Sequence, residues 1–156
     1  YIKTKQRLKS YDMELLIRNV VSRDFDQVFG LLKQLWSYKV LDYETMKKVF
    51  EEKLRATDHF FIAALYGPQI VGFCSLTVKQ NLWVQGLLGN VDEMIVEESY
   101  RGKGIGRQLL QRITEIAIEN NCKRLELESS FHREQAHTFY MELGFEKRAY
   151  LFSKEL

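Results

Sequence analysis

The feature that most restricts the fold of this 156-residue chain is a strand-like run that passes through three glycines into a helix-like run. Residues 90–96 have the apolar character of a strand, and Gly102, Gly104 and Gly106 follow it at alternate positions. Apolar residues then recur at helical spacing, at Leu109, Leu110, Ile113, Ile116 and Ala117. A strand that turns tightly into a helix with one apolar face predicts an α/β protein.

Apolar periodicity predicts further strands and helices on both sides of this stretch. Strands are expected at residues 15–20, 60–66, 70–78, 90–96 and 124–128, and two short closing strands within 145–154. Helices are expected after an N-cap at Ser22, at 43–54, after Gly106 and at 133–143, with residues 81–89 as a hairpin loop. Because the chain shows no internal repeat and no linker, residues 13–156 are predicted to form a single domain.

Charge and composition exclude several classes of protein. Lys and Arg number 23 and Asp and Glu 21, so the net charge of +2 is too small to indicate a nucleic-acid partner by itself. No apolar run approaches the roughly 18 residues of a membrane span, and no signal-peptide core is present. We therefore expect a cytoplasmic protein without a membrane or nucleic-acid partner. Residues 1–12 are basic and aperiodic, which predicts a poorly packed leader or added residues, with Met13 as the candidate native start.

The glycine-rich turn has the composition of an anion site. Glycines at alternate positions let successive backbone N–H groups point into one hollow, and the start of the following helix adds its positive dipole end. Arg101, Lys103 and Arg107 would add positive charge around a phosphate. The spacing matches neither a Walker A loop nor a dinucleotide-binding fingerprint. From these residues alone, a tight turn without a ligand remains an equal alternative.

Two motifs together resemble a known superfamily. Arg101-x-x-Gly104-x-Gly106 is similar to the acyl-CoA pyrophosphate loop, Q/R-x-x-G-x-G/A, of the GNAT superfamily of N-acetyltransferases. Residues 133–145 resemble its second signature, a helix carrying A-x-x-F-Y followed by L-G-F, and residues 152–156 resemble the end of aminoalkylphosphonate N-acetyltransferases. The order of elements from residue 13 to residue 156 also matches. One departure is Arg133, where many members carry asparagine.

This resemblance implies a fold, a cosubstrate and a set of binding residues. The implied fold is a single α/β domain whose mixed, mostly antiparallel sheet is flanked by about four helices. The implied cosubstrate is acetyl-CoA, and the superfamily often forms homodimers. In the superfamily the strand at 94–96 separates from its neighbour and leaves main-chain groups free for the pantetheine arm. The implied acetyl-CoA-binding residues are Met94, Ile95, Val96, Arg101, Gly102, Lys103, Gly104, Ile105, Gly106, Arg107, Arg133, Ala136 and Tyr140.

The resemblance also implies a catalytic acid, whereas the base has to be argued from the residues. Tyr140 matches the position that protonates the departing thiolate of CoA. An alkylammonium of pKa around 10 must lose a proton before it attacks, and a carboxylate can accept that proton. The candidates are Asp92, Glu93 and Glu128, of which Glu93 is slightly favoured. Strand alternation places Asp92 and Glu93 on opposite faces unless a bulge changes the parity.

The predicted reaction is direct attack of a primary amine in a ternary complex, because no activated Ser or Cys nucleophile is evident. A small amine metabolite is the favoured acceptor, and residues 22–54 and 81–89 are expected to shape its choice. A protein N-terminus, a protein lysine, or a non-catalytic acyl-CoA-binding regulatory module are the alternatives. No metal is expected, because His132 and His137 lie about 140° apart around a helix and no H-E-x-x-H motif is present.

Overall fold

The computed structural model describes residues 14–156, so the expectations for residues 1–12 and for Met13 lie outside the described residues. Within that range one sheet has the strand order β1-β2-β3-β4-β5. Its strands are β1 (Leu15–Asn19), β2 (His59–Tyr66), β3 (Gln69–Asn81), β4 (Gly86–Val96) and β5 (Cys122–Leu127). The first four pair antiparallel and β5 runs parallel to β4, which confirms the mixed, mostly antiparallel sheet of a single α/β domain.

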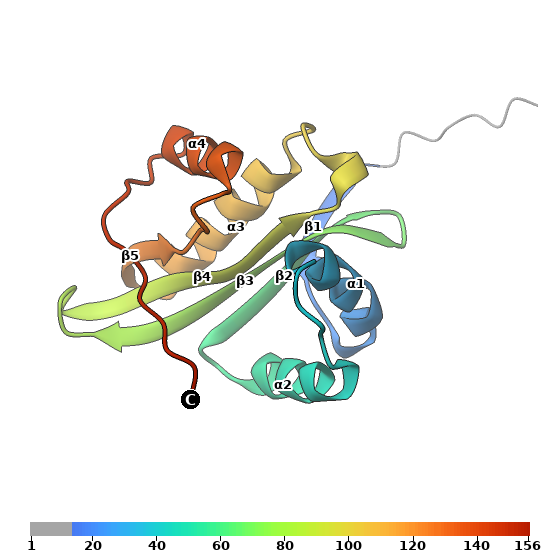
Figure 1. The fold of residues 1–156 in the computed structure, drawn as a ribbon, viewed down its shortest axis with the longest axis horizontal. Helices are drawn as coiled ribbons and strands as arrows, with labels where there is room; N and C mark the ends of the chain where they lie inside the picture. Colours follow the sequence, from blue (N-terminus) through green and yellow to red (C-terminus); the bar gives the residue numbers. More distant parts are fainter. Residues whose placement is uncertain (1–13) are drawn as a thin grey trace, which may run out of the picture.

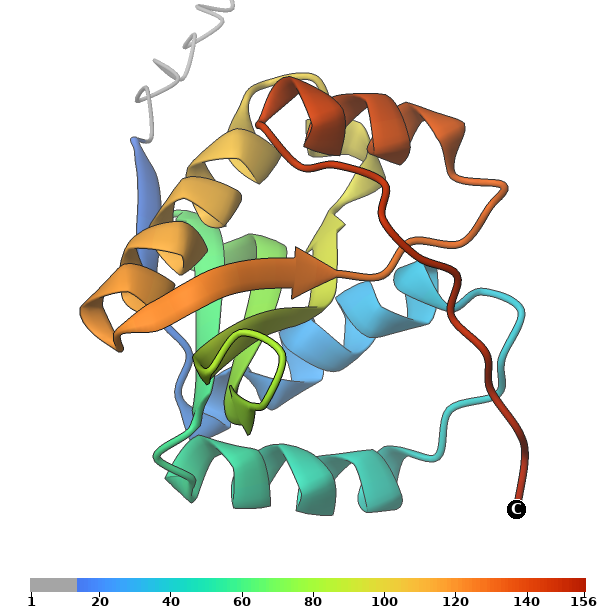
Figure 2. The same ribbon diagram turned by 90° about the vertical axis from the view of Figure 1, so that its left-hand side faces the viewer.

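Helices cover both faces of this sheet (Figures 1 and 2). Helices α1 (Phe25–Leu35) and α2 (Tyr43–Arg55) lie on one face, and α3 (Ile105–Glu119) and α4 (Glu134–Glu142) lie on the other. Because β3 is buried on both faces, its sequence is almost continuously apolar instead of alternating. The sheet therefore separates two cores, one under α3 and one under α1 and α2.

The amphipathic pattern of α3 explains why this helix is the most firmly packed. Its buried residues recur every three or four positions: Ile105, Leu109, Leu110, Ile113, Ile116 and Ala117. This stripe lies against β3, β4 and β5, and Gly72 on β3 lets it approach closely, because a Cβ there would lie 2.9 Å from Leu109 Cδ1. A packed α3 fixes the position of the glycine-rich turn that precedes it.

Two local expectations were wrong. Ser22 is not the N-cap of α1, because it lies within a short 3₁₀ turn and its hydroxyl donates to Glu51. Asp24 instead organises this corner: its carboxylate accepts a 2.9 Å hydrogen bond from Val21 N and is bound by Arg18. The hairpin loop is also shorter than residues 81–89, because β4 already begins at Gly86 and pairs there with Asn81.

The closing strands expected within 145–154 are absent from the described structure, in which residues 143–156 form no strand. Ion pairs hold this segment beside β5 instead of a backbone ladder. Arg124 Nη2 lies 2.8 Å from Glu146 Oε1, and Arg148 Cζ lies 4.2 Å from the ring centroid of Trp83. The predicted strands include the apolar run Tyr150-Leu151-Phe152, but all three side chains are exposed and belong to neither core.

None of the helices within residues 14–156 is long and apolar enough to cross a membrane.

Candidate active site

Two glycines in the turn before α3 adopt a backbone conformation that other residues rarely take. Gly102 and Gly104 both have φ of +76°, and Gly104 is the N-cap residue of α3. A Cβ built on either would meet nothing within 4 Å, so these glycines serve the conformation of the turn and not close packing. The first amides of α3 have no partner inside the helix and lie at the positive end of its dipole.

Gly106, the third glycine of this turn, is needed for packing. A Cβ there would lie 3.3 Å from Met94 Cε and 3.5 Å from Phe139 Cζ. The hydroxyl of Tyr140 lies 3.9 Å from the sulfur of the same Met94. Helix α3, the end of β4 and helix α4 therefore meet around Met94, which brings the two sequence motifs to one place.

The positively charged residues of the turn are exposed, and two of them have partners in the described structure. Arg101 Nε donates a 3.0 Å hydrogen bond to the backbone oxygen of Val96, which fastens the turn to the end of β4. Lys103 Nζ lies 4.9 Å from the ring centroid of Tyr100. Arg107 is also exposed, within the first turn of α3. The turn thus combines free amides with nearby positive charge, as an anion site requires.

The carboxyl-terminal half of β4 has an open edge. Its ladder with β5 runs from Leu87 paired with Cys122 to Val91 paired with Leu127, and then stops. Residues 94–96 still pair with β3 on the other side. Beyond Val91 the two strands diverge (Figure 2), which leaves one side of residues 92–96 without a neighbouring strand. The separation that the resemblance implied at 94–96 is therefore confirmed.

A β-bulge at the same point of β4 changes which way its carboxylates face. Cys74 pairs with Met94 and Leu76 pairs with Val91, so Ser75 faces both Asp92 and Glu93. The Ser75 hydroxyl donates to Glu93, and the Thr77 hydroxyl donates to Asp92. Ser75 and Thr77 lie on one face of β3, so both carboxylates share that face, the one covered by α1 and α2.

Glu93 is held from two sides and lies in a partly apolar setting. Its backbone N–H donates a 3.0 Å hydrogen bond to Ser75 Oγ, while its half-buried carboxylate accepts from the same hydroxyl. Burial raises the pKa of Glu93 above its usual range, and the hydrogen bond from Ser75 opposes that rise. A raised pKa makes a carboxylate a stronger base toward an ammonium group. Asp92, by contrast, is exposed.

Tyr140 lies on the opposite side of the sheet from Glu93, toward α3. Its half-buried ring packs against Phe139 and Phe145, with ring centroids 5.3 Å and 6.0 Å away. Burial raises the pKa of Tyr140, and the positive charge of Arg133 opposes the rise. The phenol therefore keeps its proton at neutral pH. Glu93 and the Met94 that Tyr140 contacts are consecutive residues of β4, beyond the point where its ladder with β5 stops.

Three further predicted site residues lie on α4, directly before it, or directly after β5. Ala136 is half-buried on the face of α4 that lies between Arg133 and Tyr140. Glu128 is exposed and follows directly after β5, where the two strands begin to diverge. Arg133 Nη2 donates a 2.8 Å hydrogen bond to the backbone oxygen of Leu35, at the end of α1.

The sequence reasoning did not identify Ser75, Thr77 or the backbone oxygen of Leu35. The two hydroxyl residues did leave a signal, because they are polar positions two apart in an otherwise apolar strand. The contact to Leu35 left none, because it joins residues 98 positions apart.

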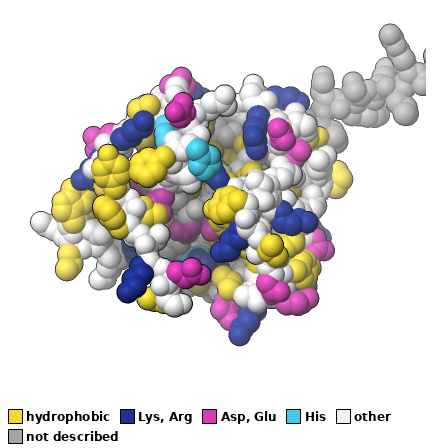
Figure 3. All heavy atoms as spheres, in the orientation of Figure 1, with side chains coloured by type: hydrophobic (Ala, Val, Ile, Leu, Met, Phe, Trp, Pro, Cys, Tyr) yellow, Lys and Arg dark blue, Asp and Glu magenta, His cyan; other side chains and the backbone are white. Residues whose placement is uncertain are grey.

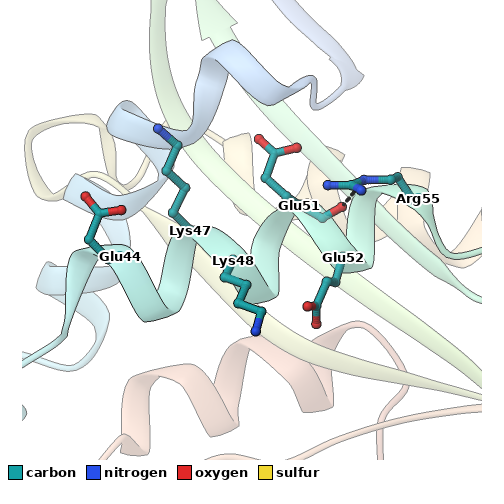
Figure 4. A pocket seen from close by; sticks show the side chains of 6 residues that line it. All are labelled: Glu44, Lys47, Lys48, Glu51, Glu52 and Arg55. Carbon is teal, nitrogen blue, oxygen red and sulfur yellow. Dashed lines mark hydrogen bonds between the residues drawn. The ribbon is translucent and has the colours of Figure 1, made fainter.

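The surface of the described structure is hollowed in more than one place. In Figure 3, which has the orientation of Figure 1, the surface is hollowed near its centre and acidic side chains are visible inside the hollow. A separate depression lies on the exposed face of α2 (Figure 4), lined by Glu44, Lys47, Lys48, Glu51, Glu52 and Arg55. Its charges alternate in sign along one helix, as on an ordinary solvated face. Among residues 14–156 no group of three or more His, Cys, Asp or Glu side chains could hold a metal ion.

Comparison with known proteins adds to this geometry. The sequence model of the Acetyltransferase (GNAT) family matches residues 25–145, a range that contains both motifs. Aminoalkylphosphonate N-acetyltransferase of Salmonella typhimurium is 29% identical over 140 residues, covering 90% of each chain. Thialysine N-epsilon-acetyltransferase of Bos taurus is 26% identical over 144 residues, covering 83% of each chain. A transcriptional regulator from Bacillus halodurans C-125 superposes with a TM-score of 0.86 at 25% identity, covering 92% of this chain and 100% of that chain.

Proposed function

Because the chain belongs to the Acetyltransferase (GNAT) family, we propose that it transfers the acetyl group of acetyl-CoA to a small primary amine by direct attack. The single observation that carries the proposal is the opening in the sheet. The free part of β4 carries Glu93 on one face and, on the other, Met94, which contacts Tyr140, and the strand leads on to the turn that precedes α3.

The residues around the opening fit acetyl-CoA. The open turn at Gly102 and Gly104, with Arg101, Lys103 and Arg107 around it, holds the pyrophosphate. The free backbone groups of residues 94–96 pair with the pantetheine arm, and Ala136 leaves room for that arm beside α4. When bound there, acetyl-CoA supplies an activated acetyl group and a thiol leaving group.

Glu93 prepares the acceptor. An alkylammonium with a pKa near 10 is mostly charged at neutral pH, so it cannot attack until a base removes a proton. The Glu93 carboxylate takes that proton directly or through a water molecule. The Ser75 hydroxyl holds Glu93 in place, because it donates to the Glu93 carboxylate and accepts from the Glu93 backbone N–H. Asp92, held by Thr77 and by Asn90 at 2.7 Å, adds negative charge that attracts the ammonium group.

Tyr140 serves the leaving group. Its hydroxyl faces Met94 at the open edge of β4, and it carries the proton that the thiolate of CoA takes up. The thiolate, whose thiol has a pKa of about 8.5, is a weaker base than the phenolate, whose phenol has a pKa of about 10, so the proton transfer is slightly uphill at the reference values. The positive charge of Arg133 reduces that difference because it favours the phenolate.

The acceptor is proposed from the relatives and from the acidic face. The two relatives named above act on an aminoalkylphosphonate and on the ε-amine of thialysine, which are small amines. The carboxylates of Asp92 and Glu93 on the α1 and α2 side suit an amine that approaches from that side.

A screen of small amines with acetyl-CoA tests the function, with release of the CoA thiol as the readout. We expect at least one amine to accelerate thiol release in proportion to enzyme, and the Tyr140→Phe variant to lose most of that activity. Binding of acetyl-CoA without turnover on any amine would instead identify a module that only binds acyl-CoA.

A further inference from the structure

Arg133 connects two parts of the molecule that are far apart in the sequence and lie on opposite faces of the sheet. Arg133 is the N-cap residue of α4. It donates its hydrogen bond to the backbone oxygen of Leu35, which is the last residue of α1. Helix α4 belongs to the α3 side of the sheet and α1 to the other side (Figures 1 and 2). The guanidinium therefore extends from the α3 and α4 side of the sheet to the α1 and α2 side, past the edge where β5 has diverged from β4.

The carbonyl that Arg133 binds is one of the last four C=O groups of α1. In any helix these four groups receive no hydrogen bond from within the helix, and they lie at the negative end of its dipole. A guanidinium makes a charge-assisted hydrogen bond there, which is stronger than a neutral one.

The segment after Leu35 is held at its ends, where Trp36 and Leu41 pack against the core under α1 and α2, and is exposed between them, at residues 37–40. Residues 36–42 form turns and irregular backbone between α1 and α2, and Tyr38 and Val40 are 76% and 96% exposed. Lys39 N donates to Trp36 O at 2.9 Å, a contact within the segment itself. The bridge from Arg133 meets this segment at its first residue and ties it to the far side of the sheet.

We propose that Arg133 is a positioning residue whose bridge to Leu35 holds the start of the segment 36–42 on the α1 and α2 side of the sheet, the side that carries Asp92 and Glu93. Tyr140 lies seven residues further along α4, two helical turns away on the same face, so the bridge also joins this segment to the helix that carries the catalytic acid. The kinetic consequence rests on the proposed function, whereas the bridge itself does not.

Hydrogen exchange of the unliganded protein tests the bridge directly. Peptides that cover residues 36–42 should exchange about tenfold faster in Arg133→Gln than in the wild type, because a hydrogen bond to a charged group is lost. Arg133→Lys should restore part of the protection. Arg148→Gln is the matched control, because Arg148 lies beside Trp83 and pairs with Glu126 and Glu146. Unchanged exchange at 36–42 in Arg133→Gln would overturn the proposal, whatever the protein catalyses.

Steady-state kinetics with acetyl-CoA and a short aminoalkylphosphonate test the consequence. Arg133→Gln should raise the KM of the amine about five- to tenfold and leave the KM of acetyl-CoA unchanged. The alkaline limb of the rate profile should move to higher pH, because loss of the positive charge raises the pKa of Tyr140. A higher KM for acetyl-CoA with an unchanged KM for the amine would overturn the proposal and assign Arg133 to the cosubstrate. If no amine is turned over, the proposed function fails and the exchange experiment still decides the bridge.

Discussion

The turn before α3 and the bulged part of β4 are two halves of one site, built in different ways. The turn offers backbone amides, and its conformation depends on the lack of a side chain at Gly102 and Gly104. The bulge offers side chains, and their direction depends on one extra residue between Met94 and Val91. A backbone site needs a local conformation, whereas a side-chain site needs a register between strands.

This difference separates binding from reaction. A pyrophosphate can be held by amides and the helix dipole without any one side chain. Proton transfer requires a titratable group at a fixed place, so it depends on Glu93, Tyr140 and the residues that orient them. Changes in the turn should therefore alter affinity for acetyl-CoA, and changes in the side chains should alter turnover.

The largest effect is expected at Glu93. Glu93→Gln keeps the shape and a hydrogen bond to Ser75 but cannot accept a proton, so kcat should fall about 10²- to 10⁴-fold while acetyl-CoA binds normally. Asp92→Asn is the matched control on the neighbouring position of the same bulge, and it should cost less than about tenfold. The kcat of both variants is measured by thiol release under saturating acetyl-CoA. Equal losses of kcat would contradict the assignment of Glu93, and not Asp92, as the base.

Tyr140→Phe should follow, with kcat lower by about 10²-fold and the Kd of acetyl-CoA changed little. The ring keeps its contacts with Phe139 and Phe145, so the variant removes the proton donor without opening a cavity. Phe139→Leu on the adjacent position controls for packing. An undiminished maximal rate in Tyr140→Phe would exclude this hydroxyl as the acid.

In the turn we expect a smaller effect, and we expect it on the affinity for acetyl-CoA instead of on kcat. Gly104→Ala places a Cβ where φ is +76°, a conformation that costs other residues about 1–2 kcal/mol, so acetyl-CoA should bind about five- to thirtyfold more weakly. Gly30→Ala on α1 is the control, because its Cβ meets nothing within 4 Å and its φ is not in the left-handed region. Calorimetry that finds the same Kd for both variants would contradict a backbone site at this turn.

The smallest effect concerns the pH dependence. The Ser75 hydroxyl donates to the ionised Glu93 carboxylate and so lowers its pKa, in opposition to burial. Ser75→Ala should raise the pKa of Glu93 further, which moves the acidic limb of the kcat/KM profile to higher pH with about a few-fold change in the plateau. A limb that moves to lower pH would show that Ser75 does not stabilise the charged form.

The same two regions show how far the sequence could predict this molecule. The turn was predictable because its requirement is local: glycines at fixed spacing between an apolar strand and an amphipathic helix. The common face of Asp92 and Glu93 was not, since strand alternation predicts opposite faces and nothing in residues 90–96 marks a bulge. The prediction of closing strands within residues 145–154 was wrong for a related reason. Residues 150–152 form an apolar run that suggests a strand, but such a run does not supply a partner strand, and in the described structure ion pairs such as Arg124–Glu146 lie between this segment and β5.

Titration calorimetry of acetyl-CoA into the wild-type protein tests the central claim most directly, because every step above requires the cosubstrate to occupy the opening beside β4. One molecule of acetyl-CoA should bind per chain, with CoA alone competing for the same site. A folded protein, verified by circular dichroism, that gives no heat with either compound would contradict the account.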